Sequence, residues 1–209
     1  GALISGTGSV AVWKPAQFAA GVLTDSVEVA MVGGSLTVLP DSELVVSRLL
    51  WVRGDIQGGG SIRVTELLYM GKLRTGTPWD TVAVASRSIQ AHTTVLNEKL
   101  CNVSGVDSDE QTSYLYSYND AMFVNLPGAV LQTVGVKVTL WAKVTNNGTF
   151  NVQTAVETKI NAQLTHSTGA TIDVKTGVLW LDDIATLSGS VVLRNNILNL
   201  NDVVTVQPG

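Results

Sequence analysis

The clearest hydrophobic pattern in the chain is an alternation of apolar and polar residues between Val134 and Leu164. Apolar or β-branched residues occupy every second position on both sides of an Asn-Gly pair at 147–148. A period of two is typical of a β-strand with one buried face, and Asn-Gly favours the tight turn of a hairpin. The pattern therefore predicts a long antiparallel hairpin over 134–164.

The second half of this segment also allows another interpretation. The apolar residues from Val152 to Leu164 that lie four positions apart fit one face of a helix over 151–165. Thr154 and Thr158 fall on the same side of the alternation, and β-branched residues favour the pleated surface of a strand. We therefore prefer the strand.

A second pattern consists of segments that begin with Gly and a small residue and continue into a short β-like run. They occur at 34–39, 60–64, 169–174 and 189–193. Short strands between Gly, Asn or Asp corners are typical of a β-solenoid or of a sandwich with many strands. Because the spacing is not constant, we expect an all-β, antiparallel, jelly-roll-like sandwich, with β-solenoid-like segments at 33–73 and 169–206.

The stretch 77–130 alternates less than its neighbours. It is bracketed by Thr-Pro-Trp-Asp at 77–80 and Leu-Pro-Gly at 126–128, and it contains an acidic, hydroxyl-rich run. The sequence predicts one β-rich domain over 1–209 with a soft boundary near 76–80. Within it, 77–130 is expected to be irregular and loop-rich, with room for a short helix around 86–100.

Composition agrees with a β fold and narrows the functions. The chain has 31 Val and 22 Thr, only 14% charged residues and a formal net charge of −4. Nucleic-acid binding needs clustered Lys and Arg, so no nucleic acid is expected. No apolar run reaches the roughly 18 residues of a membrane-spanning helix, so no membrane insertion is expected. A weakly charged, apolar chain favours covered surfaces, and we expect a homo-oligomer, either a trimer or a subunit with lattice neighbours.

The sequence offers little for catalysis or for a metal. The only histidines, His92 and His166, lie in no recognisable catalytic setting, and one Cys with two separated His does not make a zinc site. Asp107, Asp109 and Glu110 are weak calcium candidates, but their run lacks the EF-hand pattern and fits a solvated loop. We expect no enzyme activity and no cofactor.

One enzymatic alternative depends on acidic pairs. Glycoside hydrolysis requires two carboxylates about 5–10 Å apart. The carboxylates at expected strand ends are Asp55, Asp173, Asp182 and Asp183. The sequence brings no two of them together, and Asp is common at corners for conformational reasons. A spike-type polysaccharide hydrolase is therefore the third interpretation.

A recognition surface is better supported by the pattern. Alternation places Tyr114, Tyr116 and Tyr118 on one face of an extended segment, and tyrosine suits sugars or protein interfaces. Packing of these rings under a neighbouring loop is an equal alternative. Trp141 falls on the polar side of its strand and is expected to be exposed in a monomer. Trp13, Trp51 and Trp180 lie in apolar surroundings and are assigned to the core.

The Gly-led units at 34–46, 58–73 and 169–206, the low charge and the bias toward Thr, Val, Asn and Gly resemble virion surface proteins. These include the spikes, fibres, decoration subunits and jelly-roll capsid subunits of bacteriophages and other viruses. The resemblance is one of style, without a family motif. It implies a non-enzymatic structural protein of the virion that assembles and attaches to a host. The second interpretation is a carbohydrate-binding attachment module that uses the tyrosine face on a host-surface glycan.

Overall fold

The computed structural model describes residues 2–4, 7–18, 21–71, 86–105 and 113–207. All regular structure in these ranges is β, which confirms the all-β prediction. They contain no helix, and hence none that is long and apolar enough to span a membrane. The strands are β1 (Ala2–Ile4), β2 (Thr7–Val12), β3 (Ala16–Phe18), β4 (Gly21–Met31), β5 (Ser35–Val38), β6 (Glu43–Trp51), β7 (Gly54–Gln57), β8 (Ser61–Met70), β9 (Arg87–Ile89), β10 (Thr94–Asn97), β11 (Leu100–Ser104), β12 (Ser113–Ser117), β13 (Met122–Asn125), β14 (Val130–Trp141), β15 (Lys143–Asn146), β16 (Thr149–Ile160), β17 (Leu164–His166), β18 (Thr171–Leu181), β19 (Ala185–Leu187), β20 (Ser190–Leu193), β21 (Ile197–Leu200) and β22 (Val204–Val206).

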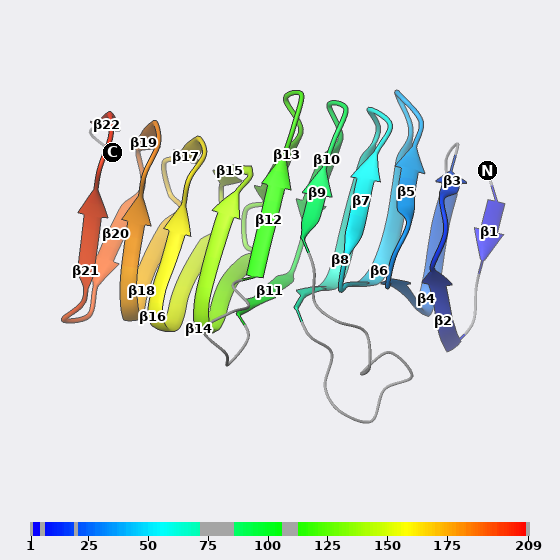
Figure 1. Ribbon diagram of the computed structural model, residues 1–209, viewed down its shortest axis with the longest axis horizontal. Coiled ribbons are helices and arrows are strands. Elements are labelled where there is room, and N and C mark those ends of the chain that lie inside the picture. The colour runs from blue at the N-terminus through cyan, green and yellow to red at the C-terminus, as the bar shows by residue number, and fades with distance from the viewer. Residues whose placement is uncertain (1, 5–6, 19–20, 72–85, 106–112, 208–209) are drawn as a thin grey trace.

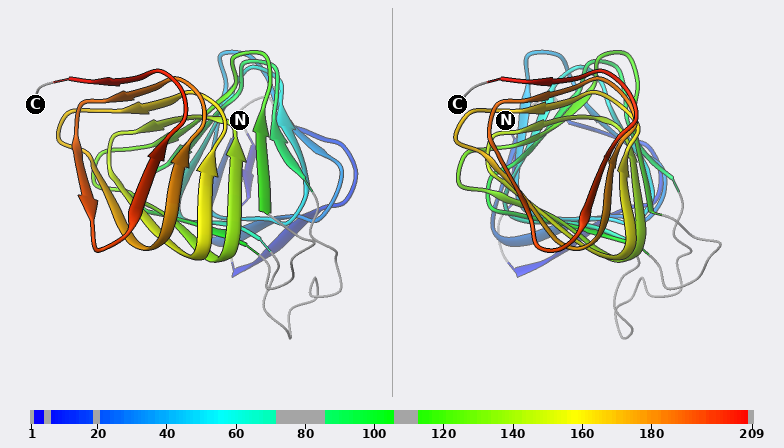
Figure 2. Two further views of the ribbon diagram at one scale, coloured as in Figure 1. Left: turned by 60° about the vertical axis from the view of Figure 1, so that its left-hand side comes forward. Right: turned by 90° about the vertical axis from the view of Figure 1, so that its left-hand side faces the viewer.

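The chain winds into a parallel β-solenoid whose coils stack along one long axis (Figure 1). Each strand pairs in parallel with the strand one coil away. On one face the register partners are Phe123, Val144, Leu164, Ala185 and Val204, which are 19 to 21 residues apart in sequence. In the end-on view of Figure 2 the coils superpose, so positions one coil apart form columns along the axis.

The strands form three faces. Face A contains β1, the first parts of β4, β6 and β8, and then β10, β13, β15, β17, β19 and β22. Face B contains β2, the second parts of β4, β6 and β8, then β11, the first parts of β14, β16 and β18, and β20. Face C contains β3, β5, β7, β9, β12, the second parts of β14, β16 and β18, and β21. Face C is turned toward the viewer in Figure 1.

Apolar side chains that point inward from the three faces fill the interior. On face A, Phe123, Val144 and Leu164 are register partners in successive coils, and each is at most 2% exposed. Burial of one such side chain contributes about 1.5–3 kcal/mol relative to the exposed state. Because each apolar residue lies on the equivalent residue of the next coil, the alternation along one strand becomes a continuous core along the axis.

The predicted antiparallel hairpin over 134–164 is wrong, and so is the jelly-roll sandwich. The Asn-Gly pair at 147–148 forms the corner between β15 on face A and β16 on face B. The strands on either side of this corner do not pair with each other; β14 pairs in parallel with β16, and β15 with β17. The alternation correctly predicts that Val144, Phe150 and Val152 point inward. It fails at Val156, which is 53% exposed where β16 bends between faces.

Both helices considered from the sequence are also wrong. Residues 151–160 belong to β16, and 86–100 contain β9, β10 and the start of β11. The described parts of 77–130 therefore contribute strands to all three faces, and the solenoid is not restricted to 33–73 and 169–206. The soft boundary near 76–80 lies outside the described residues.

From β10 onward, the corners between faces A and B alternate between two and four residues. Leu126–Ala129 and residues 167–170 are long corners, whereas 147–148 and 188–189 are short ones. A Cβ on Gly148 would lie 2.3 Å from the carbonyl oxygen of Ala129 and 2.5 Å from that of Leu126. Gly189 has the same relation to the long corner that precedes it. Each long corner thus wraps around a glycine of the short corner that follows.

We expect Gly148→Ala to destabilise the fold by about 3 kcal/mol, because two backbone oxygens must move to admit one methyl group. Gly128→Ala is the matched control, since Gly128 has φ 81° but no atom near its Cβ position. Backbone strain alone should cost about 1 kcal/mol there. Chemical denaturation of both variants measures the difference. Equal losses would contradict the wrapped corner.

A ladder of buried polar side chains follows the inner edge of face A. Asn97, Asn125, Asn146 and His166 end successive strands, and all four are fully buried. The Nδ2 of Asn97 donates to Oδ1 of Asn125 at 2.7 Å, and Asn125 donates likewise to Asn146 at 2.8 Å. The Nδ2 of Asn146 contacts Nδ1 of His166 at 3.0 Å. The ladder thus links four coils through the interior.

The same groups also hold the corners between faces A and B. The Nδ2 atoms of Asn97 and Asn125 donate to the carbonyl oxygens of Val130 and Thr149, both at 3.1 Å. His166 Nε2 lies 3.1 Å from the carbonyl oxygen of Ser190. A carbonyl only accepts, so the proton lies on Nε2, and Nδ1 accepts from Asn146. His166 is therefore the neutral Nε2–H tautomer, and burial lowers its pKa from 6.5.

This histidine should make stability depend on pH. The pKa of His166 is below 6.5 in the folded state. The stability that neutral His166 contributes is therefore fully present above pH 6.5, and it is lost as the pH falls from 6.5 through the pKa of the folded state. We expect His166→Asn, which can make both hydrogen bonds without titrating, to remove this loss. His92→Asn, at an exposed turn, is the control and should keep it. Unfolding midpoints measured across pH 4–8 test this; identical profiles for His166→Asn and the unmodified chain would contradict the assignment.

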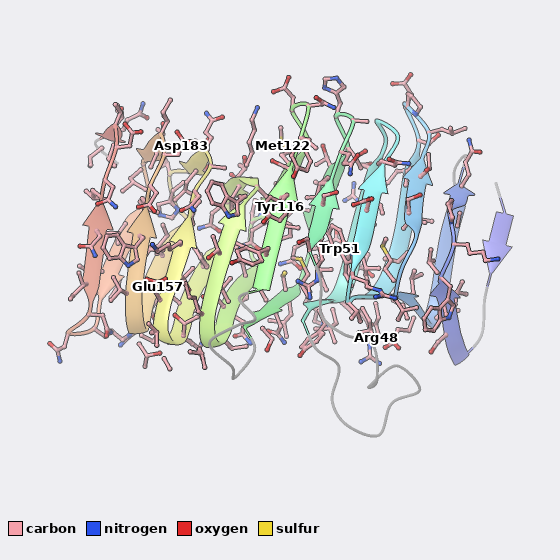
Figure 3. The ribbon with its side chains drawn as sticks, in the orientation of Figure 1. Arg48, Trp51, Tyr116, Met122, Glu157 and Asp183 are labelled. Atoms are coloured by element: carbon pink, nitrogen blue, oxygen red, sulfur yellow. The ribbon has the colours of Figure 1, made fainter. Side chains whose placement is uncertain are left out.

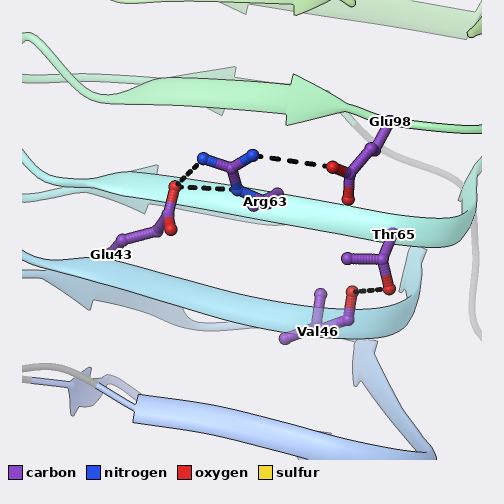
Figure 4. Close-up of polar contacts among 5 residues, drawn as sticks. All are labelled: Glu43, Val46, Arg63, Thr65 and Glu98. Carbon is purple, nitrogen blue, oxygen red and sulfur yellow. Dashed lines mark hydrogen bonds and ion pairs between the residues drawn. The ribbon is translucent and has the colours of Figure 1, made fainter. Parts of the chain in front are cut away.

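Outward side chains also link coils, more weakly. On face A, Arg63 Nη2 lies 2.9 Å from Glu43 Oε1, and Arg63 Nη1 lies 3.6 Å from Glu98 Oε1 (Figure 4). The hydrogen bond with Glu43 raises the pKa of Arg63. All three side chains are at least one-third exposed, so each pair contributes at most about 1 kcal/mol.

Candidate functional site

An aromatic row on face C is the strongest candidate site. Tyr114, Tyr116 and Tyr118 point outward from β12 and the residue after it, as the alternation predicts, and Trp141 at the end of β14 is the register partner of Tyr116. Figure 3 labels Tyr116 in the middle of the side turned toward the viewer. The structure thus brings together all four residues that the sequence singled out for recognition. We call them the aromatic row.

The rings of the aromatic row share one orientation. Ring centroids are 5.9 Å apart for Tyr114 and Tyr116 and 6.2 Å apart for Tyr116 and Tyr118, with interplanar angles of 27° and 9°. Trp141 lies 6.5 Å from Tyr116 at 11°. Tyr118 and Trp141 are 51% and 44% exposed, so the row combines flat apolar area with accessible polar edges.

Each of the three lysines described around the row has a partner. Lys143 forms an ion pair with Asp120 next to Tyr118, and Lys137 forms one with Glu157. Lys159 lies 5.1 Å from the ring centroid of Trp180 on the next coil. Desolvation raises the pKa of Tyr116, so its phenol is neutral at physiological pH. Two of the three lysines are therefore neutralised by a carboxylate, and the third lies against an aromatic ring.

A polar column continues from the row along the axis. Asn161, Asp182 and Asn201 follow Trp141 on successive coils, because their backbone N–H groups donate to Leu140, Ile160 and Leu181. Asn201 Nδ2 donates to Asp182 Oδ1 at 2.7 Å. Asn161 Oδ1 is buried and has no hydrogen-bond partner among the described residues. We call Tyr116, Trp141, Asn161, Asp182 and Asn201 the axial column.

The three tryptophans assigned to the core from the sequence differ in burial. Trp51 is fully buried, and its Nε1 donates to the carbonyl oxygen of Gly54 at 3.0 Å, as expected for a core residue. Trp13 is 50% exposed and Trp180 is partly exposed on the outer side of face C, so their assignment to the core is wrong. The second part of β18 is apolar on both sides of the alternation, which removes the signal that distinguishes inward from outward for Trp180, and Trp13 lies in the corner between β2 and β3, where alternation gives no direction.

The four carboxylates considered for hydrolysis, Asp55, Asp173, Asp182 and Asp183, each have a hydrogen-bond or ion-pair partner. Asp173 forms an ion pair with Arg194 on face B, and its pKa is lowered by this hydrogen-bonded partner. Asp55 accepts from Ser88, and Asp182 accepts from Asn201, on separate coils of face C. Asp183, which follows Asp182 in the chain, accepts from the backbone N–H of Ile184. Each of the four carboxylates thus has a different partner.

The metal candidates are not brought into a site that the structure describes. Asp107, Asp109 and Glu110 lie outside the described residues. Within the described ranges, no three His, Cys, Asp or Glu side chains gather as metal ligands. Cys101 is fully buried, and burial strongly raises the pKa of its thiol.

Comparisons with protein-family models, with curated proteins and with solved structures gave no match. The fold and the surface therefore define the class: a parallel β-solenoid with an internal asparagine ladder and an exposed aromatic row on one face.

Proposed function

We propose that this chain is a non-catalytic recognition module that binds a neutral carbohydrate chain on the aromatic row of face C. The observation that carries the proposal is the set of four outward rings with nearly parallel planes, two of them about half exposed. Sugars stack their C–H faces on such rings, and the tyrosine hydroxyls supply hydrogen bonds at the edges.

The pairing of nearby charges supports a neutral ligand. An acidic glycan would need free cations, whereas Lys143 and Lys137 are engaged with carboxylates and Lys159 with the ring of Trp180. Binding should therefore depend little on ionic strength, because no new ion pair forms with the ligand. A rigid solenoid also holds the rings in place before binding, which reduces the entropy lost on association.

The test is binding to a panel of neutral and acidic glycans, measured by titration calorimetry, whose signal does not depend on Trp141. We expect binding to neutral glycans that changes less than about twofold between 0.05 and 0.5 M salt. The double variant Tyr116→Ala/Trp141→Ala should lose it, whereas Trp13→Ala, at an equally exposed tryptophan elsewhere, should retain it. Absence of binding to every glycan, or equal binding by the double variant, would remove the proposal.

An assembling structural subunit, such as the virion protein expected from the sequence, is a second candidate. One observation favours it. In the last described coil the inward residues Leu193, Leu200 and Val206 are 45%, 47% and 74% exposed, because no described coil covers them. Exposed apolar area of this kind favours association. The homo-oligomer and the virion location are part of this proposal.

We expect the 209-residue chain to self-associate as its concentration rises, and Leu200→Lys/Val206→Lys to shift it toward the monomer by at least tenfold in concentration. Light scattering over a concentration series measures this. Thr205→Lys, at an exposed outward position of the same coil, is the matched control. A chain that stays monomeric throughout would contradict the assembly role and leave the recognition role unaffected.

A further inference from the structure

We infer that the ligand of face C is an extended, β-linked neutral polysaccharide that lies along the solenoid axis, with about one sugar per coil on the axial column. The inference rests on the proposed function and specifies its ligand. It assigns hydrogen-bonding roles to Asn161, Asp182 and Asn201, which lie beyond the aromatic row.

The direction of the ligand follows from a comparison of the aromatic row with the axial column. Along the strand, the aromatic row ends at Tyr118, where the chain turns toward face A, and the row spans four residue steps, or about 13 Å. Along the axis, the column continues from Tyr116 and Trp141 over three further coils. An extended sugar chain needs a long, straight track, and the axial column is the longer of the two.

The repeat of the column suits a β-linked chain. Neighbouring parallel strands are about 4.8 Å apart, which is close to the advance per sugar in an extended β-linked glycan. Two stacking positions, Tyr116 and Trp141, therefore lie under successive sugars. An α-linked glycan coils into a helix and would leave such a straight column after a few units. The axial column should therefore distinguish β-linked from α-linked glycans.

The polar half of the column supplies hydrogen bonds beyond the aromatic rings. Asn161 is partly exposed, but its Oδ1 is buried and has no partner among the described residues, so its amide nitrogen is the group that we assign to donate to a sugar hydroxyl. Asp182 accepts from Asn201, and its carboxylate retains acceptor capacity for a hydroxyl. The axial column thus offers stacking at the Tyr116 end and hydroxyl contacts at the Asn201 end. This fits an extended sugar chain that presents C–H groups on its faces and hydroxyls along its edges.

The experiment measures the affinity of the 209-residue chain for β-1,4-linked oligosaccharides of glucose, xylose, mannose and N-acetylglucosamine, two to six units long, with α-1,4-linked glucose oligosaccharides as the linkage control. We expect affinity for at least one β-linked series to rise with each added unit through five, and the α-linked series to bind at least tenfold more weakly. Asn161→Ala/Asp182→Ala should lower affinity about tenfold for five units and leave that for two units unchanged. Circular dichroism establishes that the variants are folded.

Tyr114→Ala/Tyr118→Ala is the matched control, because it removes the rings that lie beside the axial column and not in it. It should lower affinity less than about threefold at any length. If wild-type affinity stops rising at three units and this variant shows the larger loss, the ligand lies along the strand and the inference fails while the proposed function stands. If no oligosaccharide binds, or Trp141→Ala binds as the wild type does, the proposed function fails as well.

Discussion

Replacement of Asn125 by Ala should cost about 4 kcal/mol of folding free energy, the largest loss expected for any single ladder residue. Asn125 lies in the middle of the ladder, where its Nδ2 donates to Asn146 and to the carbonyl oxygen of Thr149, and its Oδ1 accepts from Asn97. The variant leaves Asn146 Oδ1 and the Thr149 carbonyl oxygen without these bonds in the interior. Each buried unsatisfied group costs about 1–3 kcal/mol.

Denaturant unfolding with tryptophan fluorescence measures this change. Asn151→Ala is the matched control, because Asn151 points outward from β16 and is partly exposed, and its loss should stay within about 0.5 kcal/mol. A loss below 1 kcal/mol for Asn125→Ala would show that the ladder is dispensable. A change of slope with denaturant would instead indicate that the coils no longer unfold together.

The strand content and the inward positions could be predicted, because they depend on local alternation. Val144, Phe150 and Val152 were placed on the buried side, and all three are at most 2% exposed. The direction of pairing could not be predicted in the same way. An Asn-Gly pair fits a hairpin turn and a two-residue solenoid corner equally well, and the choice depends on which strand, near or about 20 residues distant, offers the matching apolar face.

The ladder left a signal that was missed. Asn97, Asn125, Asn146 and His166 each follow an apolar residue two positions earlier, and each precedes a corner. Because Asn and His are common in turns, this position alone does not distinguish a buried ladder from turn residues. Corners of unequal length obscure the constant spacing that identifies a solenoid, and so do residues 72–85 and 106–112, which separate β8 from β9 and β11 from β12 in the sequence.

The tyrosines of the candidate site were predictable because they lie on one extended segment. Tyr114, Tyr116 and Tyr118 share a face by alternation alone, and Trp141 stood out on the polar side of its own strand. Their mutual approach was not predictable, because Tyr116 and Trp141 are 25 residues apart and become neighbours only through the parallel register of β12 and β14. The polar end of the axial column depends on the same register over three more coils.

Trp141→Ala should produce the largest loss of carbohydrate affinity of any single substitution, about 30-fold. The indole offers the greatest flat area in the row, is 44% exposed and lies beside Tyr116 at the junction of the aromatic row and the axial column. Loss of its stacking contact and of the buried apolar area costs about 2 kcal/mol, which corresponds to this factor. Titration calorimetry with the tightest-binding neutral oligosaccharide measures it.

Trp141→Phe separates stacking from any effect on the fold, because it keeps a flat ring at the same place. We expect it to retain most of the affinity, with a loss of about threefold, while Trp13→Ala has no effect. The double variant Tyr116→Phe/Trp141→Phe tests the contribution of the Tyr116 hydroxyl in a cycle with the two single variants. Equal losses for Trp141→Ala and Trp141→Phe would mean that the indole N–H, and not the face of the ring, is what the ligand contacts, since phenylalanine preserves the face and removes the donor.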